Sequence, residues 1–140
     1  MSLDQNLAVI YRTSPAVNNE QLNTLFSAAW PDHAESDFMP VLNRSLAYIC
    51  AYQAERLVGF VNLAWDGGIH AFLLDTTVHP DLRRQGIGRE LVQQAIVAAK
   101  ERGIEWISVD FEPHLKDFYY GCGFRPTDAG VMNLKRNEES

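Results

Sequence analysis

The sequence has few of the features that mark secreted, membrane-spanning or metal-binding proteins. Its 140 residues include only two cysteines, Cys50 and Cys122, which lie far apart, so we expect reduced thiols in a cytoplasmic protein. No apolar run approaches the roughly 20 residues of a membrane-spanning helix, and no signal peptide or membrane partner is expected. The four histidines show no paired spacing, which indicates that there is no metal site.

Positive charge is also scarce. The chain has 12 Lys and Arg residues against 18 Asp and Glu residues, which gives a net charge of −6 and a pI of about 5.1. This balance argues against nucleic acid as a partner, because nucleic-acid binding needs a basic surface. A local group of arginines can still bind an anionic cofactor within an acidic chain.

Hydrophobic residues make up 46% of the chain, which is enough to form the core of one domain. No repeat or linker divides the sequence, so we expect a single domain over 1–140 with a frayed polar tail at 136–140. Strands joined by hairpin turns come first, and a later helix followed by a strand implies a right-handed crossover to a parallel neighbour. The patterns predict strands over 7–12, 46–53, 57–65, 71–78, 105–111 and 131–135, and helices over 18–29, 36–43, 86–102 and 115–121.

The segment 78–89 joins the end of a strand to the start of the longest predicted helix. A helix N-terminus carries unpaired N–H groups and a partial positive charge of about half a unit. Gly86 and Gly88 leave room for a phosphate, and Arg83, Arg84 and Arg89 place three cations within seven positions. We interpret this segment as a pyrophosphate site; the plainer alternative is a helix start with solvated arginines.

Two other classes of phosphate site fit the segment less well. A Rossmann site would have a third glycine where Leu91 stands, and its strands would form βαβ units rather than hairpins. A P-loop is excluded because no Gly-Lys-Ser/Thr follows.

The pattern Arg83-x-x-Gly86-x-Gly88 is similar to the Arg/Gln-x-x-Gly-x-Gly/Ala signature of the GNAT superfamily of acetyltransferases. Residues 78–91 resemble the acyl-CoA motif of that family, and residues 118–124 resemble its later helix-turn-strand motif. The order of elements is similar along essentially the whole chain. The resemblance implies a GNAT fold of the α/β (α+β) class. Its mixed sheet would have six to seven strands, with antiparallel N-terminal strands, a splayed parallel pair and about four helices.

The resemblance also implies an enzyme that transfers an acetyl group from acetyl-CoA to a primary amine by direct attack on the thioester. The end of one splayed strand would bind the pantetheine arm through its backbone, and the amides of the following loop would hold the pyrophosphate. The cofactor-binding residues would then be Thr76, Thr77, Val78, Arg83, Arg84, Gln85, Gly86, Ile87, Gly88 and Arg89.

Two residues are candidates for catalysis. Tyr119 corresponds to the usual general acid of the family and could protonate the leaving thiolate; alternatively it is a core aromatic. Asp75 interrupts an apolar strand, where a buried carboxylate is costly without a partner. It would attract the substrate ammonium or accept its proton, unless it forms a structural salt bridge.

Three further residues are candidates for binding the acceptor. Trp30 and His33 lie in the segment after the first helix, which shapes acceptor sites in this family. Glu112 stands where many members have an Asn, and it either lines the acceptor site or favours the start of a helix. The acceptor is expected to be a small molecule. The alternatives are a protein or peptide acceptor and a non-catalytic acyl-CoA sensor, and a homodimer agrees with the habit of the family.

Overall fold

The computed structural model describes residues 7–135. The chain divides into two compact units, Met1–Val109 and Asp110–Ser140. The first unit contains one five-stranded sheet in the order β1-β2-β3-β4-β5. Its strands are β1 (Val9–Thr13), β2 (Ala47–Gln53), β3 (Arg56–Trp65), β4 (His70–Val78) and β5 (Trp106–Ser108), and its helices are α1 (Asn19–Ala29), α2 (Met39–Leu42), the 3-10 turn η2 (Pro80–Leu82) and α3 (Ile87–Glu101).

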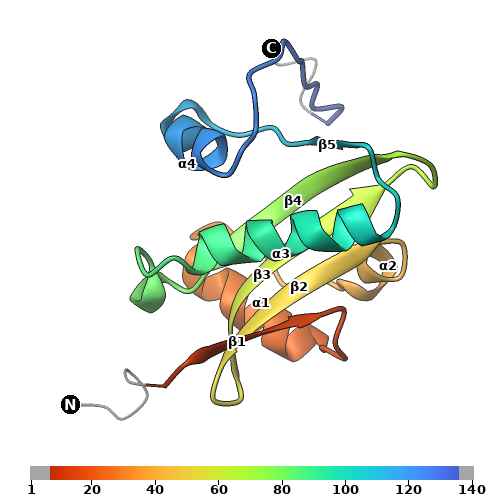
Figure 1. Ribbon diagram of the computed structural model, residues 1–140. Coiled ribbons are helices and arrows are strands. Elements are labelled where there is room, and N and C mark those ends of the chain that lie inside the picture. Colours follow the sequence, from red (N-terminus) through yellow and green to blue (C-terminus); the bar gives the residue numbers. More distant parts are fainter. Residues whose placement is uncertain (1–6, 136–140) are drawn as a thin grey trace. The chain divides into compact units, whose positions relative to one another are not determined.

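The sheet is mixed, as the sequence predicts. β1 to β4 pair antiparallel in sequence order, and β5 joins β4 in parallel after the crossover through α3. Figure 1 shows α3 lying across one face of the sheet, with α1 and α2 on the opposite face. The apolar side of α1 packs with β2 and β3 through Leu22, Leu25, Phe26, Cys50 and Phe60.

α3 lies very close to β3, and Gly59 makes this possible. A Cβ atom built on Gly59 would meet Leu91 Cδ1 at 3.0 Å and Ile87 Cγ2 at 3.2 Å. Such contacts are shorter than packed carbon atoms prefer, so a side chain at this position would push the helix away. The glycine therefore fixes the N-terminal half of α3 against the centre of the sheet.

β4 has two irregular features that the sequence does not reveal. Its register with β3 shifts so that Phe60 pairs with Thr77 while Asn62 pairs with Leu74. Asp75, inside this β-bulge, has a φ of 60°. β4 pairs with β5 only over 70–72, so residues 73–78 continue along the sheet edge beyond the end of β5. The parallel pair that the resemblance implies is therefore present, and the splay of its two strands beyond Phe72 stays a prediction.

The second unit contains the 3-10 turn η3 (Pro113–Leu115) and α4 (Lys116–Gly121). The expected final strand over 131–135 is wrong, and within residues 7–135 the sheet has five strands rather than six to seven. Val131, Met132 and Leu134 are between 75% and 83% exposed, so among residues 7–135 no partner strand or apolar face covers these apolar side chains. The tail at 136–140 lies outside the described residues.

Two other elements are shorter than the sequence predicts. The helix expected over 36–43 is a single turn, α2, because residues 36–38 bond to side chains of α1 instead of continuing a helix. The strand expected over 105–111 covers only Trp106–Ser108. No helix within residues 7–135 is long and apolar enough to cross a membrane.

Candidate active site

The N-terminus of α3 is open. Gly86 occupies the N-cap position with a φ of 84°, and no side chain caps the helix. The first bond within the helix runs from the Glu90 N–H to the Gly86 carbonyl at 3.0 Å. The amides of Ile87, Gly88 and Arg89 precede this bond, and such amides with the helix dipole form a ready site for an anion.

The loop before α3 presents polar residues to solvent. Arg83, Arg84, Gln85, Gly86 and Arg89 are all exposed. Arg84 has a φ of 65°, so two residues of this short loop adopt left-handed conformations. One arginine is also engaged within the protein, because Arg83 Nη2 donates to the Ala29 carbonyl at the end of α1, at 3.4 Å. The structure therefore brings the predicted loop residues to one place.

Ile87 is the exception among them, because its side chain belongs to the core. It is 3% exposed and lies against Gly59. A ligand could therefore contact Ile87 only through its backbone, and the backbone role expected for this loop stays a prediction.

The predicted pantetheine strand is tied to the end of α1 through Thr77. This buried threonine accepts a hydrogen bond from Trp30 Nε1 at 3.2 Å, and its hydroxyl donates to the Asp75 carbonyl at 2.9 Å. Thr76 and Val78 lie on either side of it, and Val78 pairs with Gly59 of β3. Trp30 thus holds the splayed strand, while its ring remains 47% exposed beside it.

Asp75 is not a buried carboxylate, and that expectation is wrong. The residue is exposed, because the bulge diverts it from the regular alternation of the strand. The surrounding protein still removes part of the hydration of the carboxylate, and this desolvation raises its pKa. Within residues 7–135 no cation forms an ion pair with Asp75, so the alternative of a structural salt bridge finds no support.

His33 lies in a loop that two asparagines of α1 fasten to the helix. Its Nε2 is 2.8 Å from Asn23 Oδ1, and its ring stacks on Phe38 with centroids 6.1 Å apart. Asn23 also donates to the Ser36 carbonyl, and Asn19 accepts from the Phe38 amide at 2.8 Å. Sequence reasoning missed these asparagines; their spacing of four on one helix face was the available signal.

In the second unit, Tyr119 is packed among aromatic rings. It stacks on Phe111 with centroids 4.9 Å apart and meets Phe118 and Phe124 edge to face. Only 7% of its surface is exposed. Tyr119 therefore contributes to packing in this unit, and its catalytic role stays a prediction. Tyr120, one position further along α4, touches Phe111 edge to face at 5.9 Å.

Glu112 directly precedes η3 but makes no side-chain capping bond there. Its carboxylate lies 3.5 Å from His114 Nδ1, and both side chains are exposed. The side chain of Glu112 therefore does not cap η3, and its role at the acceptor site stays a prediction.

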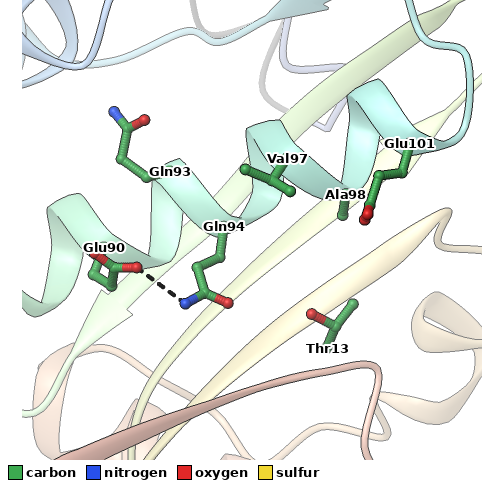
Figure 2. Close-up of a pocket in the computed structure, with 7 residues that line it drawn as sticks. All are labelled: Thr13, Glu90, Gln93, Gln94, Val97, Ala98 and Glu101. Carbon is green, nitrogen blue, oxygen red and sulfur yellow. Dashed lines mark hydrogen bonds between the residues drawn. The ribbon is translucent and has the colours of Figure 1, made fainter.

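An open hollow of about 330 Å³ lies along α3 beside β1 (Figure 2). Glu90, Gln94 and Glu101 line it, and the Gln94 amide donates to Glu90 at 3.0 Å. The two carboxylates would repel an anionic cofactor, and none of the predicted site residues borders this hollow. Among residues 7–135 no group of three metal-ligating side chains occurs either.

Comparisons with known proteins agree with this geometry. Residues 17–124 match the sequence pattern of the acetyltransferase (GNAT) family, and the chain belongs to that family. It is 33% identical over 79 residues to the N-acetyltransferase ycf52 of Porphyra purpurea, covering 56% of this chain and 45% of that protein. It is 29% identical over 117 residues to a ycf52-like N-acetyltransferase of Prochlorococcus marinus, covering 81% and 64%. The chain thus spans about half to two thirds of the length of these relatives.

The fold also agrees with a solved structure. A GNAT-family acetyltransferase from Streptococcus pneumoniae superposes with a TM-score of 0.73 at 24% identity, over 91% of this chain and 99% of that one. At this identity the likeness shows the fold alone.

Proposed function

We propose that this chain binds acetyl-CoA and transfers its acetyl group to a primary amine. The observation that carries the proposal is the N-terminus of α3, which begins at the exposed Gly86 without a side-chain cap and has three exposed arginines near it in the chain. A pyrophosphate would accept hydrogen bonds from the first amides of α3, and the arginines would add long-range attraction. Membership of an acetyltransferase family supports the choice of acetyl-CoA over other anions.

The pantetheine arm would run along residues 73–78, where β4 extends beyond β5. Backbone N–H and C=O groups at a sheet edge pair with an extended ligand as they would with a strand. In this arrangement the thioester would lie near the bulge at Asp75, between the two splayed strands. The pairing limit at Phe72 supports this placement.

The transfer would proceed without a covalent enzyme intermediate. The neutral amine attacks the thioester carbonyl, the C–N bond forms, the C–S bond breaks, and the thiolate leaves with a proton. Asp75 would attract the ammonium and accept its proton, directly or through water, and Tyr119 would protonate the thiolate. Cys50 is a poor nucleophile for the alternative covalent route, because it is buried and burial raises its pKa to about 12.

The acceptor would be a small amine. Related proteins are named as a serotonin N-acetyltransferase of rice and a histone acetyltransferase of soybean, and one solved neighbour is an aminoglycoside N-acetyltransferase in complex with CoA. Exposed carboxylates at Asp32, Glu35 and Asp37 follow α1, on the segment that His33 and the asparagines hold in place. They would favour a cationic acceptor. A cytoplasmic location and a homodimer remain part of this proposal, and the free thiols of the chain agree with a reducing compartment.

Calorimetric titration with CoA, followed by thiol release from acetyl-CoA with a panel of amines, tests the proposal. The panel contains a polyamine, an aminoglycoside, serotonin and lysine-containing peptides. Turnover with a small amine supports the proposal, whereas turnover with peptides alone indicates a protein acceptor. CoA binding without turnover on any amine indicates a sensor.

Tyr119→Phe tests the proposed acid within the same assay. Phenylalanine keeps the ring contacts with Phe111 and removes only the hydroxyl, so we expect kcat to fall at least roughly tenfold with CoA affinity preserved. Tyr120→Phe is the matched control on the same helix. Full activity of both variants would assign Tyr119 to packing.

A further inference from the structure

The start of the anion loop is held by His79. This residue occupies the N-cap position of η2, and its Nδ1 accepts a hydrogen bond from the Asp81 amide at 3.1 Å. Its own amide donates to the Val58 carbonyl of β3 at 2.8 Å, and its carbonyl accepts from the Leu82 amide at 3.0 Å. His79 thus connects the end of β4 to the turn through three hydrogen bonds.

The η2 turn that His79 caps lies directly before Arg83 and Arg84. Leu82 is buried at the end of η2, and the Arg83 amide closes the turn on the Pro80 carbonyl. Arg84 follows in a left-handed conformation, which costs free energy unless its surroundings hold it. Loss of the cap would release the turn and allow the loop before α3 to change its conformation.

The cap requires a neutral imidazole. Nδ1 can accept the Asp81 N–H only while it carries no proton, because both nitrogens of a protonated imidazole are donors. Desolvation lowers the pKa of His79, Arg56 and Arg83 lower it further, and only Asp81 opposes them. The ring is 19% exposed, and Asp81 Oδ2 lies 3.8 Å from Nδ1 and 4.0 Å from Arg56 Nη2. A protonated His79 could bond this carboxylate only by giving up the Asp81 amide.

We propose that His79 is a positioning residue for the cofactor loop and that its protonation weakens binding of the CoA pyrophosphate. This inference rests on the proposed function, because it assumes that the loop holds that pyrophosphate. It predicts that acidification lowers the affinity for CoA, although protonation of His79 adds a positive charge to the loop. A positive charge near an anion site should strengthen binding, whereas loss of the cap should weaken it. The direction of the pH dependence therefore separates a positioning role from a purely electrostatic one.

Three variants test the inference. Asparagine at an N-cap offers an acceptor atom without a titrating group, so His79→Asn should restore the cap. His79→Ala removes the acceptor. His70→Asn is the matched control, because His70 is a second histidine of the first unit that also faces an aspartate, Asp66, and starts β4 at the end away from the loop. The probe is dephospho-CoA, which lacks the phosphate monoester that itself titrates near pH 6.

Calorimetry from about pH 8 to about pH 5.5 spans the histidine range. We expect wild type and His70→Asn to lose affinity on acidification and His79→Asn to bind independently of pH in this range. His79→Ala should bind roughly fivefold more weakly at the upper end, as the loss of a cap implies. Thermal unfolding of each variant separates loss of binding from loss of the fold.

The possible outcomes separate failure of the positioning role of His79 from failure of the proposed function. If wild type does not bind dephospho-CoA or CoA, the proposed function fails. If wild type binds and His79→Ala binds equally well, or if acidification strengthens binding through His79, the positioning role is overturned. If His79→Ala unfolds, the comparison of wild type with His79→Asn across pH still decides the question.

Discussion

The two long helices of the first unit begin in opposite ways. At the start of α1, Asn18 Oδ1 accepts from the Gln21 amide at 2.8 Å, and Gln21 Oε1 accepts from the Asn18 amide at 3.1 Å. This reciprocal capping box satisfies donors that a helix start leaves unpaired. At the start of α3, Gly86 supplies no such side chain. The first amides of α1 are therefore capped by side chains of the same helix, whereas the first amides of α3 have no side-chain cap.

The charges at the two helix starts differ less. Each first turn carries one acidic residue, Glu20 in α1 and Glu90 in α3, which suits the positive end of the helix dipole. Only α3 is also flanked by arginines, and cations at a helix start are unfavourable for the helix itself. A helix start that lacks a side-chain cap and lies among arginines is reasonable if a bound anion compensates. The comparison thus supports assigning binding to α3 and stability to α1.

Among the substitutions that test this comparison, Gly88→Val should have the largest effect on CoA affinity. A branched side chain at this position would occupy the space of a phosphate beside the open amides. We expect CoA affinity to fall at least roughly tenfold while the protein stays folded, since valine has a somewhat higher helix propensity than glycine. Titration calorimetry with circular dichroism measures both. Unchanged affinity would remove the phosphate assignment.

Gly86→Asn should give α3 a side-chain N-cap like the one that Asn18 provides for α1. Asparagine tolerates positive φ better than most residues, and a Cβ on Gly86 would meet nothing within 4 Å. Its side chain would then compete with the ligand for the amides, so CoA affinity should fall roughly fivefold with little change in melting temperature. A melting temperature that collapses would mean that only glycine fits this cap.

Asn18→Ala is the converse experiment on α1. Removal of the capping side chain should lower the free energy of unfolding by about 1 kcal/mol, and CoA affinity should not change. Urea unfolding measures the first quantity and calorimetry the second. A loss of affinity without a loss of stability would contradict the division between the two helices.

The smallest effect is expected for Arg84→Ala. The side chain is exposed, and its contribution should come from screened attraction, worth a few-fold in CoA affinity at low salt. The difference from wild type should shrink as the salt concentration rises. A difference that does not depend on salt would point to packing or backbone conformation instead.

Both helix starts could be predicted from sequence, because short-range chemistry determines them. Asn18 opens one helix, and the glycine and arginine pattern at 83–88 identifies the other. The exposed position of Asp75 could not be predicted, because it depends on a bulge created by the register of β4 against β3. The strand expected over 131–135 is wrong for a related reason, since an apolar segment forms a strand only where a neighbouring strand is available to pair with it.

The clamp from Asn19 and Asn23 also escaped prediction. Polar residues on a helix surface usually face solvent, and only the folded loop shows that these amides bond to residues 33–38. The role of His79 was equally hidden, because a histidine before proline has no spacing that distinguishes a cap from a base.

The absence of a side chain at Gly59 links the hydrophobic core to ligand affinity. Gly59 pairs with Val78, the residue before His79, and on its other side it admits Leu91 and Ile87 of α3. α3 therefore lies close to the sheet at the strand end where the proposed pantetheine path would meet the phosphate loop. A single methyl group added at this buried position would force Leu91 or Ile87 to move by a few tenths of an ångström. If the proposed cofactor path is correct, a substitution at Gly59 should lower CoA affinity although no ligand would touch this residue.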